Sequence, residues 1–373
     1  MSDTLSASTS ARPTAAPDRP VTAVKWWATL GATVIALQVA VTVRWMTGPF
    51  FHRVDPGPTP LPGWMKVALI TLQVVLPIAA ALVLYRVVVR PWRRERRISL
   101  EGLMAVSFLL LAFQDPLSAY FNHWYAYNAW QVNMGSWVNS LPGALAPGTP
   151  SHQVAYPLLI VPPAYVVIFM LVTTMGAAIM RRAKTRWPGT SRLGLVTICL
   201  AVMVPFDIVF EGIVFMPLGS WEYPGGHVKI FADTYHAYPL NEALTTGAIF
   251  TMFACIKYFA NDRGQCLAER GTEHLRGGPQ RIASIRLLAV FGLITAAMTL
   301  GYSLPNLWFG AQSTQWNEDI QKRSYLTYTC GEGPGIACPA PDVPLLRNDN
   351  RGAGANGRDF GLNYPPQYRY DRG

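Results

Sequence analysis

The segment that decides the fold is WMKVALITLQVVLPIAAALVLYRVVVRPWRRERR, residues 64–97. From about Trp64 to Val89 it is predominantly apolar, and it is long enough to cross the apolar core of a bilayer. Six arginines fall within positions 86–97. Because clusters of Lys and Arg beside an apolar segment mark its cytoplasmic end, the segment predicts a transmembrane helix with a cytoplasmic arginine-rich end.

The composition of the whole chain agrees with a membrane protein. Of its 373 residues, 51% are hydrophobic and only 14% are charged, which is too apolar for an ordinary soluble protein of this length. The net charge of +10 comes from basic clusters between apolar segments. Membrane orientation explains these clusters, so nucleic-acid binding is not predicted.

Other apolar segments of similar character occur along the chain. They lie at about 26–45, 100–113, 154–180, 193–215, 239–259 and 282–304. We therefore predict an all-α, polytopic integral membrane helix bundle with about seven transmembrane helices. The basic loops follow the second, fourth and sixth spans, which places the N-terminus inside and the C-terminus outside a cell membrane.

Three parts of the chain differ in composition. Residues 1–24 are rich in Ser, Thr, Ala and Pro and are predicted to be a disordered tail. Residues 25–304 form the transmembrane domain with outer loops at 114–153 and 216–240, and residues 305–373 form a polar extracytoplasmic tail. Cys330 and Cys338 lie in this last part, and either a small-loop disulfide or two free cysteines fits the sequence.

Acidic residues inside the apolar segments are the first candidates for chemistry, because a carboxyl group in a bilayer core costs a few kcal/mol. Asp207 and Glu211 are four residues apart and share one helix face, and Pro205 before them predicts a kink. Asp115 and Glu242 stand at the outer ends of two other spans. We predict that these four carboxyl groups converge beneath the outer loops and are catalytic.

Each of these residues also has a structural interpretation. Glu242 in a first helical turn complements the helix dipole, and Asp115 before Pro116 could organise the end of a helix. Asp207 and Glu211 repel each other in a low dielectric, so one of them is expected to be protonated or paired. A buried, protonated carboxyl group is suited to general acid catalysis.

The segment LAFQDPLSAYFNHWYAYNAWQVNMGSWVNSLPG, residues 111–143, is rich in Tyr, Trp and Asn and has no Lys or Arg. It is predicted to line or cover a site, since aromatic faces stabilise a developing cation. The Asn residues are also ordinary turn formers. Substrate contacts are predicted in this loop and the opposite one, at Tyr120, Asn122, His123, Tyr127, Asn128, Trp137, Trp221 and Asn241.

Several familiar motifs are absent from the sequence. It has no HExxH or His-rich box, no paired CxxC, no P-loop, no G-x-S-x-G and no G-x-G-x-x-G after a strand. The sequence therefore predicts no metal site and gives no support to phosphate, acyl-serine or dinucleotide chemistry.

A set of short motifs resembles those of the avermectin-type spirocyclase family. They are Gln114-Asp115-Pro116-Leu117, Tyr120-Phe121-Asn122, Tyr127-Asn128, Gly135-Ser136-Trp137, Phe206-Asp207 with Glu211-Gly212, Phe215-Met216-Pro217-Leu218-Gly219 and Tyr238-Pro239-Leu240-Asn241-Glu242-Ala243. The likeness covers the third to seventh spans and both outer loops. It implies a membrane enzyme that closes an apolar dihydroxy-ketone, such as a polyketide, into a spiroketal, in some members with a dehydration.

The resemblance further implies that no cofactor is required and that the partners are the apolar substrate and membrane lipids. The substrate and the oligomeric state stay open. Two other functions fit the same residues: a transporter in which the carboxyl groups relay protons or bind a cation, and a non-catalytic membrane protein that binds a lipid. No inverted repeat with matched broken helices supports the transporter.

Overall fold

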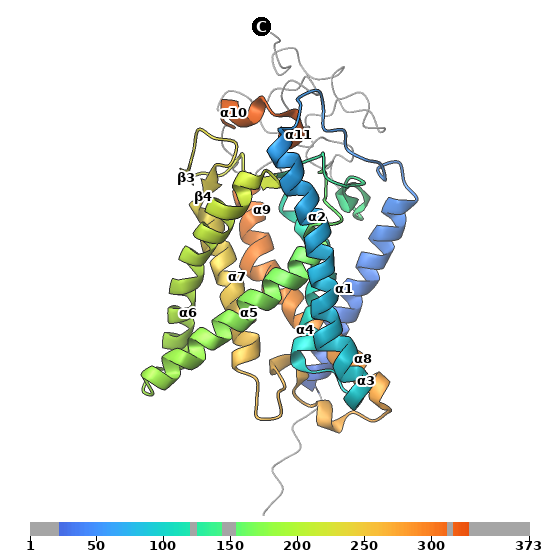
Figure 1. The fold of residues 1–373 in the computed structure, drawn as a ribbon. Coiled ribbons are helices and arrows are strands. Elements are labelled where there is room, and N and C mark those ends of the chain that lie inside the picture. Colours follow the sequence, from blue (N-terminus) through green and yellow to red (C-terminus); the bar gives the residue numbers. More distant parts are fainter. Residues whose placement is uncertain (1–21, 120–124, 144–153, 312–315, 328–373) are drawn as a thin grey trace, which may run out of the picture.

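The computed structural model describes residues 22–119, 125–143, 154–311 and 316–327, and it shows a bundle of long helices capped by loops at one end (Figure 1). The long helical runs are α1 (Thr22–Met46), α2 (Gly63–Leu84), α4 (Leu100–Leu111), α5 (Val161–Arg186), α6 (Arg192–Asp207), α7 (Leu240–Tyr258) and α8 (Pro279–Met298). Four of them continue without a break: α4 runs directly into η2 (Ala112–Ala119), and the other three are α2, α6 and α8. The continuations are η1 (Tyr85–Val89) and α3 (Arg90–Glu95) after α2, η5 (Ile208–Phe215) after α6, and η9 (Thr299–Ser303) and α9 (Leu304–Ala311) after α8.

Among the described residues, six helical runs are long and apolar enough to cross a membrane. They are Ala23–Met46, Gly63–Glu95, Leu100–Leu117, Val161–Arg186, Arg192–Leu218 and Pro279–Phe309. The prediction of a mostly helical chain with several membrane-crossing helices is thus confirmed. The predicted span at 239–259 corresponds to α7, which is not among the six and is largely buried between its neighbours.

Some helix boundaries differ from those expected. The last long run does not end near Leu304 but continues as α9, and α5 begins at Val161 rather than near residue 154. Three residues after Pro205, where a kink is predicted, the backbone changes from α-helical to the π-helical η5, which begins at Ile208. Most of the expected N-terminal tail lies outside the described residues. Cys330 and Cys338 also lie outside them.

Helix starts follow from local capping. The Ser99 hydroxyl accepts a hydrogen bond from the Gly102 amide at 3.3 Å at the start of α4, and Ser191 does the same for Gly194 at 3.1 Å at the start of α6. Such side chains satisfy amides that have no partner within the helix. α4 and α6 therefore begin at fixed residues, which fixes how far along the bundle Asp115, Asp207 and Glu211 lie.

Aromatic packing joins the inner helices. Phe108 of α4, Phe169 of α5 and Phe253 of α7 contact one another, with ring centroids 4.9–5.4 Å apart. By contrast, one face of α2 is apolar and exposed, with Val67, Ile70, Val74, Val75, Ile78 and Leu82 among its exposed side chains. A face of this kind is suited to lipid rather than water.

The two ends of the bundle differ in charge. We call the end that holds α3 and the loops around Lys184 and Arg263 the basic end. There the Arg286 guanidinium donates to Oε1 of buried Glu269 at 2.7 Å and to the Ile98 carbonyl at 3.1 Å. These contacts join the start of α8 to the segment before α4.

The opposite end, which we call the loop end, is built from short elements. They are η2 (Ala112–Ala119), η3 (Trp137–Ser140), η6 (Met216–Leu218), β1 (Ala126–Tyr127), β2 (Trp221–Glu222), β3 (Lys229–Ile230), β4 (Tyr238–Pro239), α10 (Glu318–Gln321) and α11 (Ser324–Thr327). The basic end has two short helices of its own, η7 (Leu267–Glu269) and η8 (Thr272–His274). Antiparallel β1 and β2 join the two loops, with Ala126 opposite Glu222 and Tyr127 opposite Trp221. β3 pairs with β4 in the same way.

The segment Trp316 to Thr327 packs onto the loop end. The Ala129 amide donates to the Tyr325 carbonyl at 2.7 Å, and the Ser324 hydroxyl donates to the Pro56 carbonyl at 2.8 Å. Trp316 and Tyr325 are buried. This segment is therefore an ordered part of the loop end.

Candidate functional site

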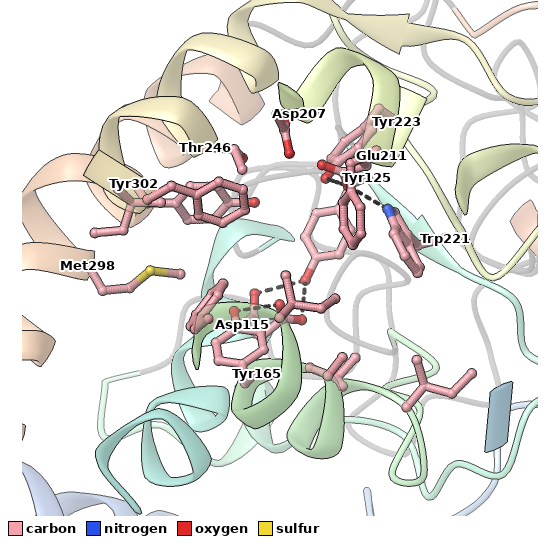
Figure 2. A pocket seen from close by; sticks show the side chains of 18 of the residues that line it. Asp115, Tyr125, Tyr165, Asp207, Glu211, Trp221, Tyr223, Thr246, Met298 and Tyr302 are labelled. Atoms are coloured by element: carbon pink, nitrogen blue, oxygen red, sulfur yellow. Dashed lines mark hydrogen bonds between the residues drawn. The ribbon is translucent and has the colours of Figure 1, made fainter. Parts of the chain in front are cut away.

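A cavity with an empty volume of about 790 Å³ lies inside the bundle just below the loop end (Figure 2). Its lining comes from η2, α5, α6, η5, α7, α8 and η9, together with the loops that carry β1 and β2. Asp115, Asp207 and Glu211 are among the described lining residues, and none of those residues is Lys or Arg. The cavity therefore collects carboxyl groups without a basic counter-charge in its described wall.

Asp115 is held by three tyrosines. The Tyr165 hydroxyl donates to Oδ1 at 2.8 Å, while the Tyr127 and Tyr125 hydroxyls donate to Oδ2, the latter at 3.2 Å. Tyr125 also donates to the Asp115 backbone carbonyl at 2.8 Å. This side chain is fixed by α5 on one side and by the β1 region on the other.

Glu211 lies in η5, and its Oε1 accepts two hydrogen bonds at 2.6 Å, from the Trp221 indole and from the Tyr223 hydroxyl. Both donors belong to the loop that follows η6. Gly219, with φ +71°, turns the chain into that loop, and a β-carbon there would lie 2.4 Å from the Met65 methyl group. The turn thus depends on a glycine, both for its backbone conformation and for the space beside α2.

Glu242, in the first turn of α7, lies behind the cavity wall. Its Oε1 accepts from Thr246 and Tyr302 at 2.8 Å each and lies 3.1 Å from the Tyr223 hydroxyl oxygen, and its Oε2 is 3.3 Å from the Asn306 amide. Tyr223 and Tyr302 themselves line the cavity. Glu242 therefore reaches the cavity only through the hydroxyl groups in front of it.

The Tyr223 hydroxyl stands between two carboxyl groups and carries a single hydrogen. It can donate that hydrogen to Glu211 or to Glu242, but not to both. For both contacts to be hydrogen bonds, the other carboxyl group must be protonated and donate to the Tyr223 oxygen. The geometry therefore requires a shared proton in the Glu211–Tyr223–Glu242 chain.

Asp207 has one free oxygen. Its Oδ2 accepts from the Tyr238 hydroxyl at 2.5 Å, whereas its Oδ1 is buried and has no hydrogen-bond partner in the described part of the protein. Tyr238 approaches because residue 212 of η5 is glycine: a β-carbon there would lie 2.9 Å from the Tyr238 ring. In Figure 2 the Asp207 carboxyl group points toward the centre of the cavity. A hydroxyl group of a bound molecule would satisfy the free oxygen.

The tyrosines of the two loops stay protonated. Burial, and then the neighbouring Asp115, raise the pKa of Tyr127 well above its ordinary value of 10.0. Burial, followed by Glu211 and Glu242, does the same to the pKa of Tyr223. Both side chains are therefore neutral hydrogen-bond donors at physiological pH.

The structure brings the four predicted carboxyl groups to one region: three line the cavity and Glu242 contacts its wall. Of the predicted substrate contacts, Tyr127 and Trp221 line the cavity. Asn128 instead donates to the Gly219 carbonyl at 2.8 Å, and Trp137 stacks on a phenylalanine with ring centroids 4.1 Å apart.

Of the remaining predicted contacts, the structure describes one, Asn241, and it does not border the cavity. Its side-chain amide has two buried atoms without hydrogen-bond partners in the described structure. Tyr120, Asn122 and His123 lie outside the described residues. Among the described residues no group of three or more His, Cys, Asp or Glu side chains could hold a metal ion.

The sequence reasoning missed most of the hydroxyl groups that hold the carboxyl groups. These are Tyr125, Tyr165, Tyr223, Tyr238, Thr246 and Tyr302. They come from six different elements or loops, and only the three-dimensional fold brings them together. A tyrosine in an apolar span, such as Tyr165 or Tyr302, was the one available signal, because a buried hydroxyl needs a partner.

Comparison with protein families gives a match. A family model described as Spirocyclase AveC-like matches residues 95–326 of the chain. The matched region runs from the end of α3 to α11 and contains every cavity-lining residue named above. Comparisons with curated proteins and with solved structures gave no match.

Proposed function

The chain belongs to the AveC-like spirocyclase family, and from this premise we propose that it is an integral membrane cyclase that closes an apolar dihydroxy-ketone into a spiroketal by acid catalysis. The residues that would carry this reaction line the cavity below the loop end. Asp115, Asp207, Glu211 and Glu242 are the proposed catalytic set.

The observation that supports this proposal is the position of the Tyr223 hydroxyl, which lies within hydrogen-bond distance of both Glu211 and Glu242 and can link them through a shared proton. A carboxyl group held protonated in an apolar cavity is the proton donor that spiroketal formation needs. Glu242 accepts from several donors and is shielded, whereas Glu211 borders the cavity. We therefore assign the acid to Glu211, and a charge-stabilising role to Glu242.

The proposed reaction has three steps. One substrate hydroxyl first adds to the ketone carbon to give a hemiketal. Glu211 then donates a proton to the hemiketal hydroxyl, the carbon–oxygen bond breaks, and water leaves an oxocarbenium ion. The second substrate hydroxyl attacks that carbon, and its proton passes to the free Oδ1 of Asp207.

The atoms balance, since one keto-diol gives one spiroketal and one water. The proton that Asp207 gains must return to Glu211 before the next turnover. Meanwhile the cation is stabilised by the aromatic faces of the wall and by the Asp115 carboxylate. An apolar wall that admits little bulk water keeps the oxocarbenium ion from reverting to the hemiketal.

We also propose the orientation and location of the protein. The Lys and Arg clusters of the basic end, at positions 86–97, 181–186 and 257–286, favour a cytoplasmic location for that end. The loop end and the cavity would then lie on the extracytoplasmic side of a cell membrane, with lipids around the exposed helix faces.

The test uses the full-length protein in lipid vesicles with a synthetic, membrane-soluble keto-diol. We expect spiroketal formation faster than the spontaneous reaction, with one stereoisomer in excess on chiral chromatography. Product at the spontaneous rate and isomer ratio would contradict the proposal. Proton or cation flux through the same vesicles would instead identify a transporter, and saturable binding without turnover a lipid-binding protein.

A further inference from the structure

The wall of the cavity is closed toward the loop end and more open toward one side. On the loop side, Tyr125, Tyr127 and Tyr223 expose only 6%, 7% and 5% of their surface. The half-buried lining residues include Ala164 and Ile168 of α5 and Phe210 of η5. Asp115, Trp221 and Tyr302 are half-buried as well, so the accessible part of the wall includes the side between α5 and η5 but is not confined to it.

The course of the two helices produces this opening. α5 packs closely against α6 and α7, but not against η5, the π-helical continuation of α6. In Figure 1, α5 and α6 meet near the basic end and separate toward the loop end. We call the space between Ala164, Ile168 and Phe210 the α5–η5 gap.

The α5–η5 gap lies between two helices that are long and apolar enough to cross a membrane, Val161–Arg186 and Arg192–Leu218. Beside it, Val209 and Ile213 of η5 are exposed large apolar side chains. Such surfaces face lipid in a bundle of this kind. The gap therefore opens toward the bilayer rather than toward water.

A row of aromatic rings connects this side to a catalytic carboxyl group. Phe206, Phe210, Phe215 and Trp221 follow one another with ring centroids 5.3, 4.6 and 6.1 Å apart. The last ring donates its indole N–H to Glu211 at 2.6 Å. An apolar molecule would meet only aromatic and aliphatic side chains along this row before it reaches the carboxyl groups.

We propose that the α5–η5 gap is a lateral entrance through which the substrate passes from the bilayer to the cavity. The ligand class is an amphipathic molecule whose long apolar chain stays in the gap while its oxygen-bearing end reaches Asp207 and Glu211. This inference rests on the proposed function for the identity of the reacting groups. The entrance itself is tested independently of turnover.

The experiment labels the full-length protein in phosphatidylcholine vesicles with an uncharged aryl diazirine that dissolves in the bilayer. After illumination, mass spectrometry of peptides locates the insertion sites. In the wild type we expect label on the peptide that carries Asp115 and, within the peptide that carries Glu211, on Glu211 itself as distinct from the lipid-facing Val209 and Ile213. This label should be lost in Ala164→Trp, because the indole fills the gap. A charged, water-soluble diazirine should leave these two peptides unlabelled.

The matched control is Leu171→Trp. Leu171 lies two turns from Ala164 on the same side of α5, is 51% exposed and is not a described lining residue of the cavity. Its substitution should leave the cavity label unchanged. If Ala164→Trp fails to fold, Ile168→Trp replaces it, since Ile168 lines the same gap.

Two results would overturn the entrance: cavity label that persists in folded Ala164→Trp and Ile168→Trp proteins, or equal labelling by the water-soluble probe. Neither result depends on catalysis. If the label enters through the gap but no keto-diol is cyclised, the proposed function fails and the entrance stands. If the wild type cyclises and both Trp variants keep its label and its kcat/KM, the entrance fails and the function stands.

Discussion

The Tyr223 hydroxyl donates to Oε1 of Glu211 at 2.6 Å, which joins a loop to a carboxyl group inside a helix that is long and apolar enough to cross a membrane. Tyr223 follows β2, and β2 is held in place by its pairing with β1 of the other loop. The orientation of the proposed acid therefore depends on both loops at once. A disturbance of either loop should affect catalysis even where it touches no substrate.

Glu211→Gln keeps the size of the side chain and removes its acidic proton. General acid catalysis typically contributes on the order of 10²–10⁴-fold to a rate, so kcat for spiroketal formation should fall by about that factor. Stopped time courses with chiral product analysis measure it. Glu318→Gln is the control, because the Glu318 side chain is 89% exposed and does not line the cavity. Undiminished turnover in Glu211→Gln would remove this residue from the role of acid.

Tyr223→Phe keeps the ring and removes the hydroxyl that links Glu211 to Glu242. A hydrogen bond to a charged group contributes about 1.5–3 kcal/mol, which corresponds to a loss of roughly 10- to 100-fold in kcat. We also expect a changed pH–rate profile, because the two carboxyl groups no longer share a proton through the phenol. Tyr258→Phe is the control: Tyr258 lies at the other end of α7 from Glu242, so its substitution should leave kcat and the pH–rate profile unchanged. A wild-type pH–rate profile in Tyr223→Phe would contradict a proton shared between Glu211 and Glu242.

Much of the fold could be predicted from the sequence, because span length and charge position act locally. The arginines at 86–97 and the apolar segments are visible without any tertiary information, and they predicted the long helices. The convergence of Asp115, Asp207 and Glu211 also follows from topology, since alternate helix ends must meet on one side of a membrane. The structure adds that Glu242 lies behind the wall rather than in it.

The hydrogen-bond partners could not be predicted in the same way. The two-residue pairing of β1 with β2 has no sequence pattern, yet it sets Trp221 beside Glu211 and Tyr127 beside Asp115. Trp137 and Asn128 look like site residues by composition, but the fold uses them for stacking and for a carbonyl contact. Aromatic and amide side chains serve packing and binding equally well, so composition alone does not separate the two uses.

Gly212→Ala tests how Asp207 is positioned. The added β-carbon would lie 2.9 Å from the Tyr238 ring, so the ring and its hydroxyl must move away from Asp207. Overpacking of this kind typically costs about 1–3 kcal/mol of stability. We expect a lower unfolding temperature in detergent together with reduced kcat. Gly63→Ala is the matched control, because no atom lies within 4 Å of its β-carbon; equal effects of the two substitutions would show that the Tyr238 contact does not matter.

Glu222→Gln tests the effect of pH on stability. Burial raises the pKa of Glu222 well above its ordinary value of 4.5, with Arg323 opposing and Glu211 and Asp319 adding to the rise. Both of its side-chain oxygens lack a hydrogen-bond partner in the described structure. The folded protein thus favours the protonated form.

The sign of the pH effect follows from this preference. The pKa of Glu222 is higher in the folded than in the unfolded protein. The contribution of its protonated carboxyl group to the free energy of unfolding is therefore complete below pH 4.5, and it is lost as the pH rises toward the pKa of the folded state. The loss amounts to as much as about 1.4 kcal/mol for each pH unit within that window. Glutamine cannot ionise, so the variant should lose less stability than the wild type between pH 4.5 and 8, which thermal unfolding followed by tryptophan fluorescence measures. Glu318→Gln is the control: its side chain is 89% exposed, so its plot of unfolding temperature against pH should follow that of the wild type. Parallel plots for the wild type and Glu222→Gln would show that folding does not change the pKa of the Glu222 carboxyl group.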